Sequence, residues 1–124
     1  DKTNAFQDYV RFDSNGVDSA PGPNNKMIAP YDGRLIKVLY RGESAGGNTD
    51  IRFHKNTDGN EDLDTIAVET HTILGLGANA TGTAVFTPGA LFNAGDIIGL
   101  SIDPQTQTDI TIMTAVWEYD TYID

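Results

Sequence analysis

The chain has 124 residues, no cysteine and a formal net charge of −10 at pH 7. Its length fits one domain with a buried core, and its fold depends on neither disulfides nor thiolate metal sites. The acidity disfavours nucleic-acid binding, because an acidic surface repels phosphates, and no apolar run approaches the roughly 20 residues needed to cross a bilayer.

Strand-length apolar runs separated by turn signals predict an all-β domain. Thirteen Gly and five Pro punctuate the chain, and helical periodicity is almost absent. The predicted strands are residues 6–12, 26–29, 34–41, 50–55, 65–74, 83–87, 97–102 and 109–119. About eight strands is the count of a jelly roll, so we predict an antiparallel β-sandwich with that topology.

Residues 34–41 are apolar on both faces. Ile36, Val38 and Tyr40 fall on one face, and Leu35 and Leu39 fall on the other. We therefore expect this strand to be buried on both sides, either in the middle of a sheet or at a subunit contact.

Two later strands alternate between apolar and polar residues. Ile51 and Phe53 point inward in the first, and the second follows the same rule through Ile66 and Val68. The two histidines, His54 and His71, fall on the polar phase of their strands, so we expect both at the surface.

The longest segment without predicted structure is residues 13–25, which is rich in Gly, Pro, Asn and Asp. We therefore divide the chain into residues 1–25, an N-terminal strand and flexible loop that acts as an arm or linker, and residues 26–124, the jelly-roll domain. Because the chain begins with Asp1 and not Met, we expect a processed protein or a fragment of a longer one.

The charges are distributed unevenly along the sequence. All eight Lys and Arg lie at or before Lys55, whereas eleven Asp and Glu residues follow it. Strands from the two halves of a chain interleave in a Greek key, so this asymmetry in sequence need not be an asymmetry in space.

Two motifs that are associated with catalysis or cofactors lack the helix they require. Residues 42–46 match the G-x-S-x-G nucleophile elbow, and residues 75–80 imitate a dinucleotide-binding loop. Both motifs need a helix directly afterwards, and here a strand or a Pro-Gly step follows instead. We interpret both as Gly-rich loops and predict that the protein is not an enzyme.

One loop concentrates oxygen ligands. Alternate positions carry a carboxylate or carboxamide, at Asn56, Asp58, Asn60, Asp62 and Asp64. Calcium prefers six to eight oxygen ligands, so this loop is the candidate metal site, and no other cofactor is indicated. The alternative is a polar hairpin loop that turns at Asp58-Gly59.

The chain also resembles a known group of proteins. The Phe-x-x-Gly-Asp step from Phe92 to Asp96 resembles small trimeric jelly rolls of the C1q and tumour-necrosis-factor type. With residues 33–38, 46–56 and 114–120, the chain from about residue 30 onward resembles C-terminal jelly-roll domains of tailed-bacteriophage structural proteins, both tail-fibre tips and capsid-decoration proteins.

This resemblance implies a homotrimer on the surface of a virion, in contact with other virion proteins or with a host-surface glycan or receptor, and it carries over no catalytic residues. A symmetric oligomer would cover the excess of apolar side chains. The candidate contact residues are Tyr40, Phe86, Phe92, Met113, Trp117 and Tyr119, and the alternative is that all six belong to the core. The competing function is a carbohydrate-binding β-sandwich with a platform of aromatic side chains, with or without calcium.

Overall fold

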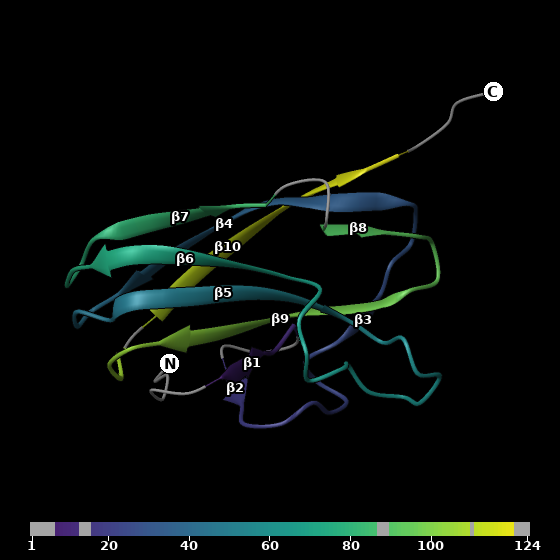
Figure 1. Ribbon diagram of the computed structural model, residues 1–124, viewed down its shortest axis with the longest axis horizontal. Coiled ribbons are helices and arrows are strands. Elements are labelled where there is room, and N and C mark those ends of the chain that lie inside the picture. The colour runs from purple at the N-terminus through teal and green to yellow at the C-terminus, as the bar shows by residue number, and fades with distance from the viewer. Residues whose placement is uncertain (1–6, 13–15, 87–89, 110, 121–124) are drawn as a thin grey trace.

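The computed structural model describes residues 7–12, 16–86, 90–109 and 111–120. These residues form ten strands and no helix, arranged in two antiparallel sheets that pack as a sandwich (Figure 1). The prediction of an antiparallel β-sandwich is therefore confirmed. No helix long and apolar enough to span a bilayer is found in the described part of the chain.

Sheet A has six strands. They are β1 (Asp8–Val10), β2 (Val17–Asp18), β3 (Met27–Ile28), β5 (Gly47–Lys55), β6 (Glu69–Leu76) and β9 (Ile97–Pro104). Their order is β2-β1-β9-β5-β6, and β3 pairs with β9 beside β1.

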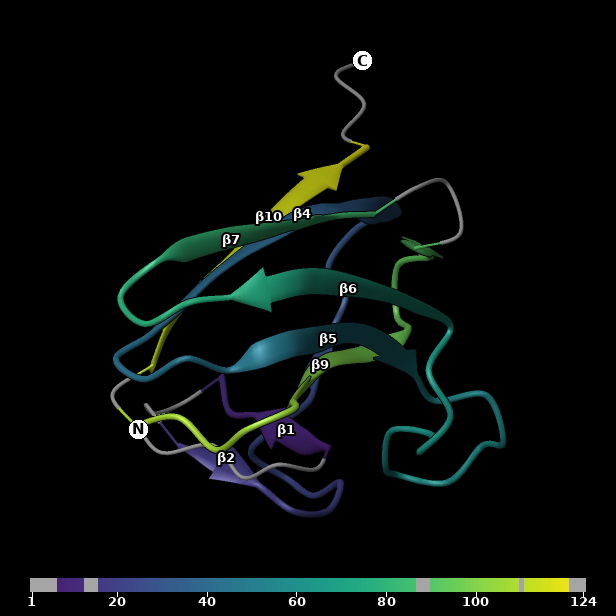
Figure 2. The same ribbon diagram turned by 60° about the vertical axis from the view of Figure 1, so that its left-hand side comes forward.

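Sheet B has four strands, β4 (Gly33–Gly42), β7 (Thr81–Val85), β8 (Leu91–Phe92) and β10 (Thr111–Tyr119). Their order is β10-β4-β7, and β8 pairs with the start of β4. Figure 2 shows β4, β7 and β10 as the upper layer of the sandwich, with β5, β6 and β9 below them.

The antiparallel pairs are nested along the chain. β5 pairs with β6, β4 pairs with β7 around them, and β1 and β3 pair with β9 outside both. A chain whose antiparallel strand pairs are nested in this way and folded into two sheets has the jelly-roll topology.

The observed strands differ from the predicted ones in number and in their boundaries. β2 and β8 are two-residue strands, too short to give a pattern in the sequence, and they raise the count from about eight to ten. The fifth predicted strand begins too early, because β6 starts at Glu69 and leaves Ile66 83% exposed and Val68 45% exposed. Phe6, Thr87 and Ile110, which were assigned to predicted strands, lie outside the described residues.

The core lies between the two sheets. Leu35, Val38 and Tyr40 of β4 face Ile51 and Phe53 of β5, and all five side chains are at most 1% exposed. Aromatic rings close one part of this core, with ring centroids of Phe53 and Phe92 6.2 Å apart and those of Phe92 and Trp117 5.8 Å apart.

The prediction of which residues share a face of β4 was wrong, because this strand contains a bulge. Val116 of β10 pairs with Lys37, whereas Trp117 pairs with Leu35, so Ile36 has no partner in β10. The extra residue changes the phase, and Leu35 joins Val38 and Tyr40 in the core instead of facing away from them. β4 is therefore buried on one face only within the single chain.

A second, smaller buried cluster lies on the outer side of sheet A. The loop of residues 56–68 returns across β9, where the Leu63 side chain covers Gly99. Backbone hydrogen bonds from Asp64 N to Lys55 O and from Val68 N to Phe53 O, both 2.8 Å long, hold the loop in place. β9 is therefore covered on both faces.

The described part of residues 1–25 packs on sheet A. β1 pairs with β9, and the Tyr9 side chain is 2% exposed. The Asn25 side chain is fully buried and donates hydrogen bonds of 3.0 Å to Asp18 Oδ2 and Ala20 O. The proposed domain boundary at residue 25 stays a prediction, and Asp13, Ser14 and Asn15 of the expected loop lie outside the described residues.

Because the outer side of sheet A is covered at Gly99, a side chain added at this position should destabilise the fold. A Cβ atom there would lie 2.4 Å from Leu63 Cδ1 and 2.6 Å from Asn25 O, so either the loop or β9 must move. We expect Gly99→Ala to lower the free energy of unfolding by about 1–3 kcal/mol, measured by urea denaturation.

The matched control is Gly77→Ala, because no heavy atom lies within 4 Å of a Cβ at that position. This variant should unfold at nearly the urea concentration of the unmodified chain. Equal stability of the two variants would mean that the loop does not pack on Gly99.

Candidate functional site

The two Gly-rich motifs lie in loops between strands. Residues 42–46 lead from β4 in sheet B to β5 in sheet A, and Ser44 is exposed on a segment without helical structure. Residues 75–80 complete β6 and turn into β7, with positive φ at Gly75 (57°) and Asn79 (55°). The prediction that both are loops is confirmed, although the first joins strands of different sheets.

The oxygen-rich loop of residues 56–64 is held together by hydrogen bonds among its own groups. Asn56 Nδ2 donates to Asn60 Oδ1 at 2.9 Å and to the Asp62 carbonyl at 2.6 Å. Asp58 accepts from the backbone N–H of Asn60 at 3.0 Å, and Asp64 accepts from the Thr57 hydroxyl. Gly59, with φ at 84°, makes the turn.

These contacts direct the side-chain oxygens of the loop toward its own donors and not toward one shared point. Lys26 also bonds to Asp62 Oδ1 at 3.2 Å and to the Glu61 carbonyl. Among the described residues, no group of three or more His, Asp or Glu side chains is arranged to hold a metal ion. The geometry favours the hairpin-loop interpretation, and calcium binding stays an untested prediction.

His54 is buried, so the prediction of a surface position was wrong for this residue. It projects from the outer face of β5, but the loop of residues 56–68 and the Tyr9 ring, 5.2 Å away between centroids, enclose it. Its Nδ1 lies 2.8 Å from the Asp64 carbonyl, and its Nε2 lies 2.6 Å from Ser101 Oγ. A carbonyl only accepts, so Nδ1 carries the proton and Ser101 donates to Nε2.

This His–Ser pair resembles a base next to a nucleophile, but both side chains are fully buried. A substrate could not approach the Ser101 hydroxyl without displacement of the covering loop. The pair therefore acts here as a hydrogen-bonded link between β5, β9 and the loop. His71 is half-buried, bonds to Glu69 and packs edge-on against Phe86, with ring centroids 4.7 Å apart.

Half of the six candidate contact residues are core residues of the single chain. Tyr40, Phe86 and Phe92 are 1%, 4% and 3% exposed, so they leave no side-chain surface for a second subunit. Met113 and Trp117 are half-buried and pack against the core from β10, as does Tyr119. Only these three stay available as predicted contacts.

The outer face of sheet B is not covered by any other described strand. Strand pairing sets its side chains in four rows across β10, β4 and β7 or β8. The rows are Ile112–Arg41–Thr81, Thr114–Leu39–Thr83, Val116–Lys37–Val85 and Glu118–Arg34–Leu91. We call these twelve residues the sheet B face. No other strand lies above this face in Figures 1 and 2.

The sheet B face combines exposed aliphatic side chains with cations. Ile112 is 61% exposed, Val85 60% and Leu91 54%. Large apolar side chains gathered on one surface of a soluble protein mark an interaction site more often than an isolated one does.

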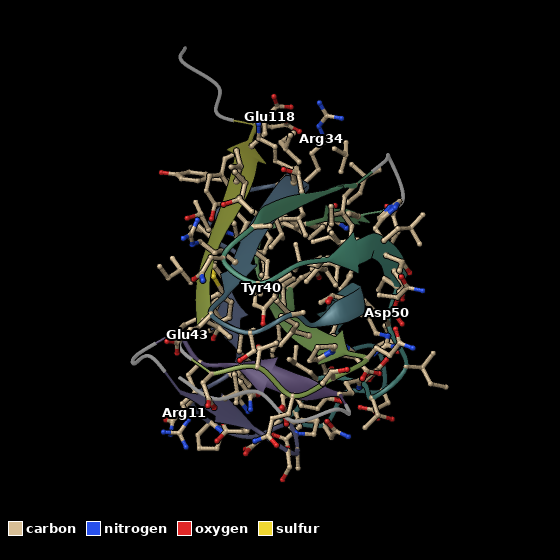
Figure 3. The ribbon with its side chains drawn as sticks, turned by 90° about the vertical axis from the view of Figure 1, so that its left-hand side faces the viewer. Arg11, Arg34, Tyr40, Glu43, Asp50 and Glu118 are labelled. Atoms are coloured by element: carbon tan, nitrogen blue, oxygen red, sulfur yellow. The ribbon has the colours of Figure 1, made fainter. Side chains whose placement is uncertain are left out.

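Two cations on this face form no ion pair with any described residue. Arg34 Nε lies 3.1 Å from Glu118 Oε1, and Figure 3 shows the two side chains together at one end of sheet B. Lys37 and Arg41 have no such partner among the described residues. The other described cations, Arg11, Lys26, Arg52 and Lys55, are each paired with Asp.

β10 forms one edge of the sheet B face. Within the described residues, its nine positions pair with β4 on one side and with no strand on the other. Glu118 is its only charged residue. A long edge with few charges is a surface to which another chain can add.

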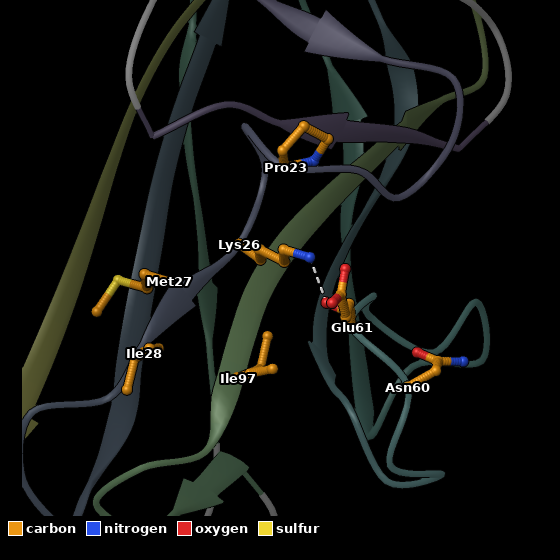
Figure 4. A pocket seen from close by; sticks show the side chains of 7 residues that line it. All are labelled: Pro23, Lys26, Met27, Ile28, Asn60, Glu61 and Ile97. Atoms are coloured by element: carbon orange, nitrogen blue, oxygen red, sulfur yellow. Dashed lines mark hydrogen bonds between the residues drawn. The ribbon is translucent and has the colours of Figure 1, made fainter.

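A shallow depression of about 370 Å³ lies beside β3 (Figure 4). Its lining includes the apolar side chains of Met27, Ile28 and Ile97 together with the charged residues Lys26 and Glu61. The Lys26 ammonium already bonds to the Glu61 carbonyl and to Asp62, so it is occupied within the chain. The Asn60 side chain, which also lines the depression, donates to Asp58 Oδ2 at 2.9 Å.

Most tyrosine side chains in the described part of the chain are too little exposed to form a sugar platform. Tyr9 and Tyr40 are buried, whereas Tyr31 is 52% exposed and packs against Tyr119 with ring centroids 6.1 Å apart. The fifth tyrosine of the chain, Tyr122, lies outside the described residues. No observation on these rings favours carbohydrate binding.

Comparisons of the chain with protein families, with curated proteins and with solved structures give no match. The function must therefore be inferred from the surfaces described above.

The burial of neutral His54 predicts a dependence of stability on pH. Burial lowers the pKa of the imidazole below its usual 6.5, against the hydrogen bond to the Asp64 carbonyl and with the help of the Arg52 cation. Below about pH 6.5 the unfolded chain then binds more protons than the folded one, so the free energy of unfolding should fall as the pH falls through this value. Urea denaturation across this range measures the effect.

The control is His54→Gln, which cannot titrate and should lack the decrease in stability just below pH 6.5. The contributions of Asp18 and Asp96 to stability can be separated from that of His54. The pKa values of these two carboxyl groups are lowered from 3.8, so their contributions are lost only at still lower pH. An unchanged pH profile in His54→Gln would show that His54 does not cause the decrease.

Proposed function

We propose that this chain is a non-enzymatic structural domain of a bacteriophage virion, which associates with copies of itself as a homotrimer and presents its loops at the particle surface. The observation that carries this proposal is the sheet B face, where Ile112, Val85 and Leu91 are more than half exposed. A partner that covers these side chains removes apolar surface from water, which favours association.

Two features of the fold support self-association over catalysis. The sheet B face and the outer edge of β10 are not covered by another described strand, whereas the described nucleophile–base pair, Ser101 and His54, is fully buried. A sheet face that combines apolar and charged groups fits a protein partner better than a small substrate, which binds in concave sites.

The trimer and the virion come from the resemblance of the Phe92–Asp96 step and of the flanking segments to trimeric and phage jelly rolls. In the structure this step forms β8 and the turn into β9, where Gly95 has φ at 91° and Asp96 pairs with Lys55 at 3.1 Å. A fibre tip and a capsid-decoration protein are both consistent with this arrangement, since each exposes loops on a rigid sandwich.

The proposal predicts the oligomeric state. Sedimentation equilibrium at micromolar concentration should give three times the chain mass of 13.4 kDa, because the sheet B face is covered only in the oligomer. A monomer that also binds neither bacterial cells nor phage capsids would overturn the proposal.

A further inference from the structure

The sheet B face differs in charge from the rest of the chain. It holds three of the eight Lys and Arg residues and, among the described residues, one carboxylate, Glu118. The whole chain has a net charge of −10, so the acids lie overwhelmingly on other surfaces. A second copy of this chain, with its excess of carboxylates, is therefore a partner of complementary charge for the sheet B face.

We propose that the sheet B face of one copy binds a different, carboxylate-bearing surface of a second copy, and that Lys37 and Arg41 are the cations that make this contact. The inference rests on the proposed self-association and adds its geometry. Such a contact is heterologous, because the two copies use different surfaces.

The positions of the two cations suit this role. Lys37 and Arg41 lie on the same face of β4 with Leu39 between them, about 13 Å apart at the usual rise of a strand. Val116 and Val85 flank Lys37 in its row, and Ile112 flanks Arg41. When a partner covers these aliphatic side chains, water is excluded and the attraction between opposite charges grows.

The same charges oppose a contact in which two identical faces meet. Such an isologous contact would place Lys37 and Arg41 of one copy against those of the other, and no unpaired carboxylate lies on the face to separate them. Juxtaposed like charges disfavour association, so the charge pattern selects the heterologous geometry. A heterologous contact that closes after three copies gives a ring, which agrees with the proposed trimer.

An anionic polysaccharide is the competing occupant. The twelve residues of the face include no aromatic side chain and several aliphatic ones. Aliphatic rows pack against protein side chains, so the face fits a second copy better.

The first experiment removes the two cations. We expect Lys37→Gln with Arg41→Gln to weaken trimer formation about tenfold or more, measured by sedimentation equilibrium. The control, Ser19→Glu with Thr106→Glu, lowers the net charge by the same two units at exposed loop positions and should leave the trimer intact. About 1 M salt, where the Debye length is about 3 Å, should weaken the unmodified trimer and change the glutamine variant little.

The second experiment distinguishes the two geometries. Lys37→Glu with Arg41→Glu is mixed with the unmodified chain. In a heterologous assembly the sheet B face of the variant cannot bind the carboxylate-bearing surface of another copy. A variant chain that enters an assembly therefore prevents ring closure, and the amount of closed trimer falls. In an isologous assembly its acidic face would bind the basic face of the unmodified chain, and mixed dimers that are tighter than either parent would overturn the inference.

The remaining outcomes are also decisive. A trimer that survives the glutamine substitutions overturns this inference and leaves the proposed function standing. An unmodified chain that is monomeric overturns this inference, and it overturns the proposed function as well if it binds neither bacterial cells nor phage capsids. A monomer that binds dextran sulfate, and loses this binding in the glutamine variant, assigns the face to an anionic polysaccharide instead.

Discussion

The bulge at Ile36 of β4 is the constraint on which the rest of the structure depends. It lets one strand place Leu35 and Val38 in the core while Lys37 and Arg41 face outward. Side chains of a strand alternate, so without this extra residue either the core would lose Leu35 or it would receive Lys37. One irregular position thus defines both the hydrophobic core and the charged outer face of sheet B.

Ion pairs join the early basic half of the sequence to the late acidic half. Arg34 pairs with Glu118, Arg52 with Asp103 and Lys55 with Asp96, each between segments that are far apart in the chain. Exposed pairs of this kind contribute little to stability, but they neutralise cations locally. Among the described residues, the two cations without an ion pair, Lys37 and Arg41, therefore lie together on one face.

The sequence predicted those features that local patterns determine, and it failed where distant segments meet. The alternation of Ile51 and Phe53 with polar residues placed β5 correctly. Because no helix is predicted after either Gly-rich motif, both were correctly assigned to loops. His54 follows the same alternation but is buried, because Leu63 and the rest of its loop fold over Gly99, a contact that no local pattern encodes. Lys37, Leu39 and Arg41 occupy every second position of their strand, so the sequence alone places them on one face. Only the strand pairing shows that the residues next to Lys37 and Arg41 in β10 and β7 carry no carboxylate.

The position of β10 in the chain has a consequence for the order of folding. β10 pairs with β4 across about 70 intervening residues, so sheet B lacks one of its outer columns until β10 has left the ribosome. A chain in which β4 and β7 have formed without β10 lacks the column of Ile112, Thr114, Val116 and Glu118, so its sheet B face is incomplete. Completion of this face therefore waits for a contact between distant segments, which makes it a late step of folding.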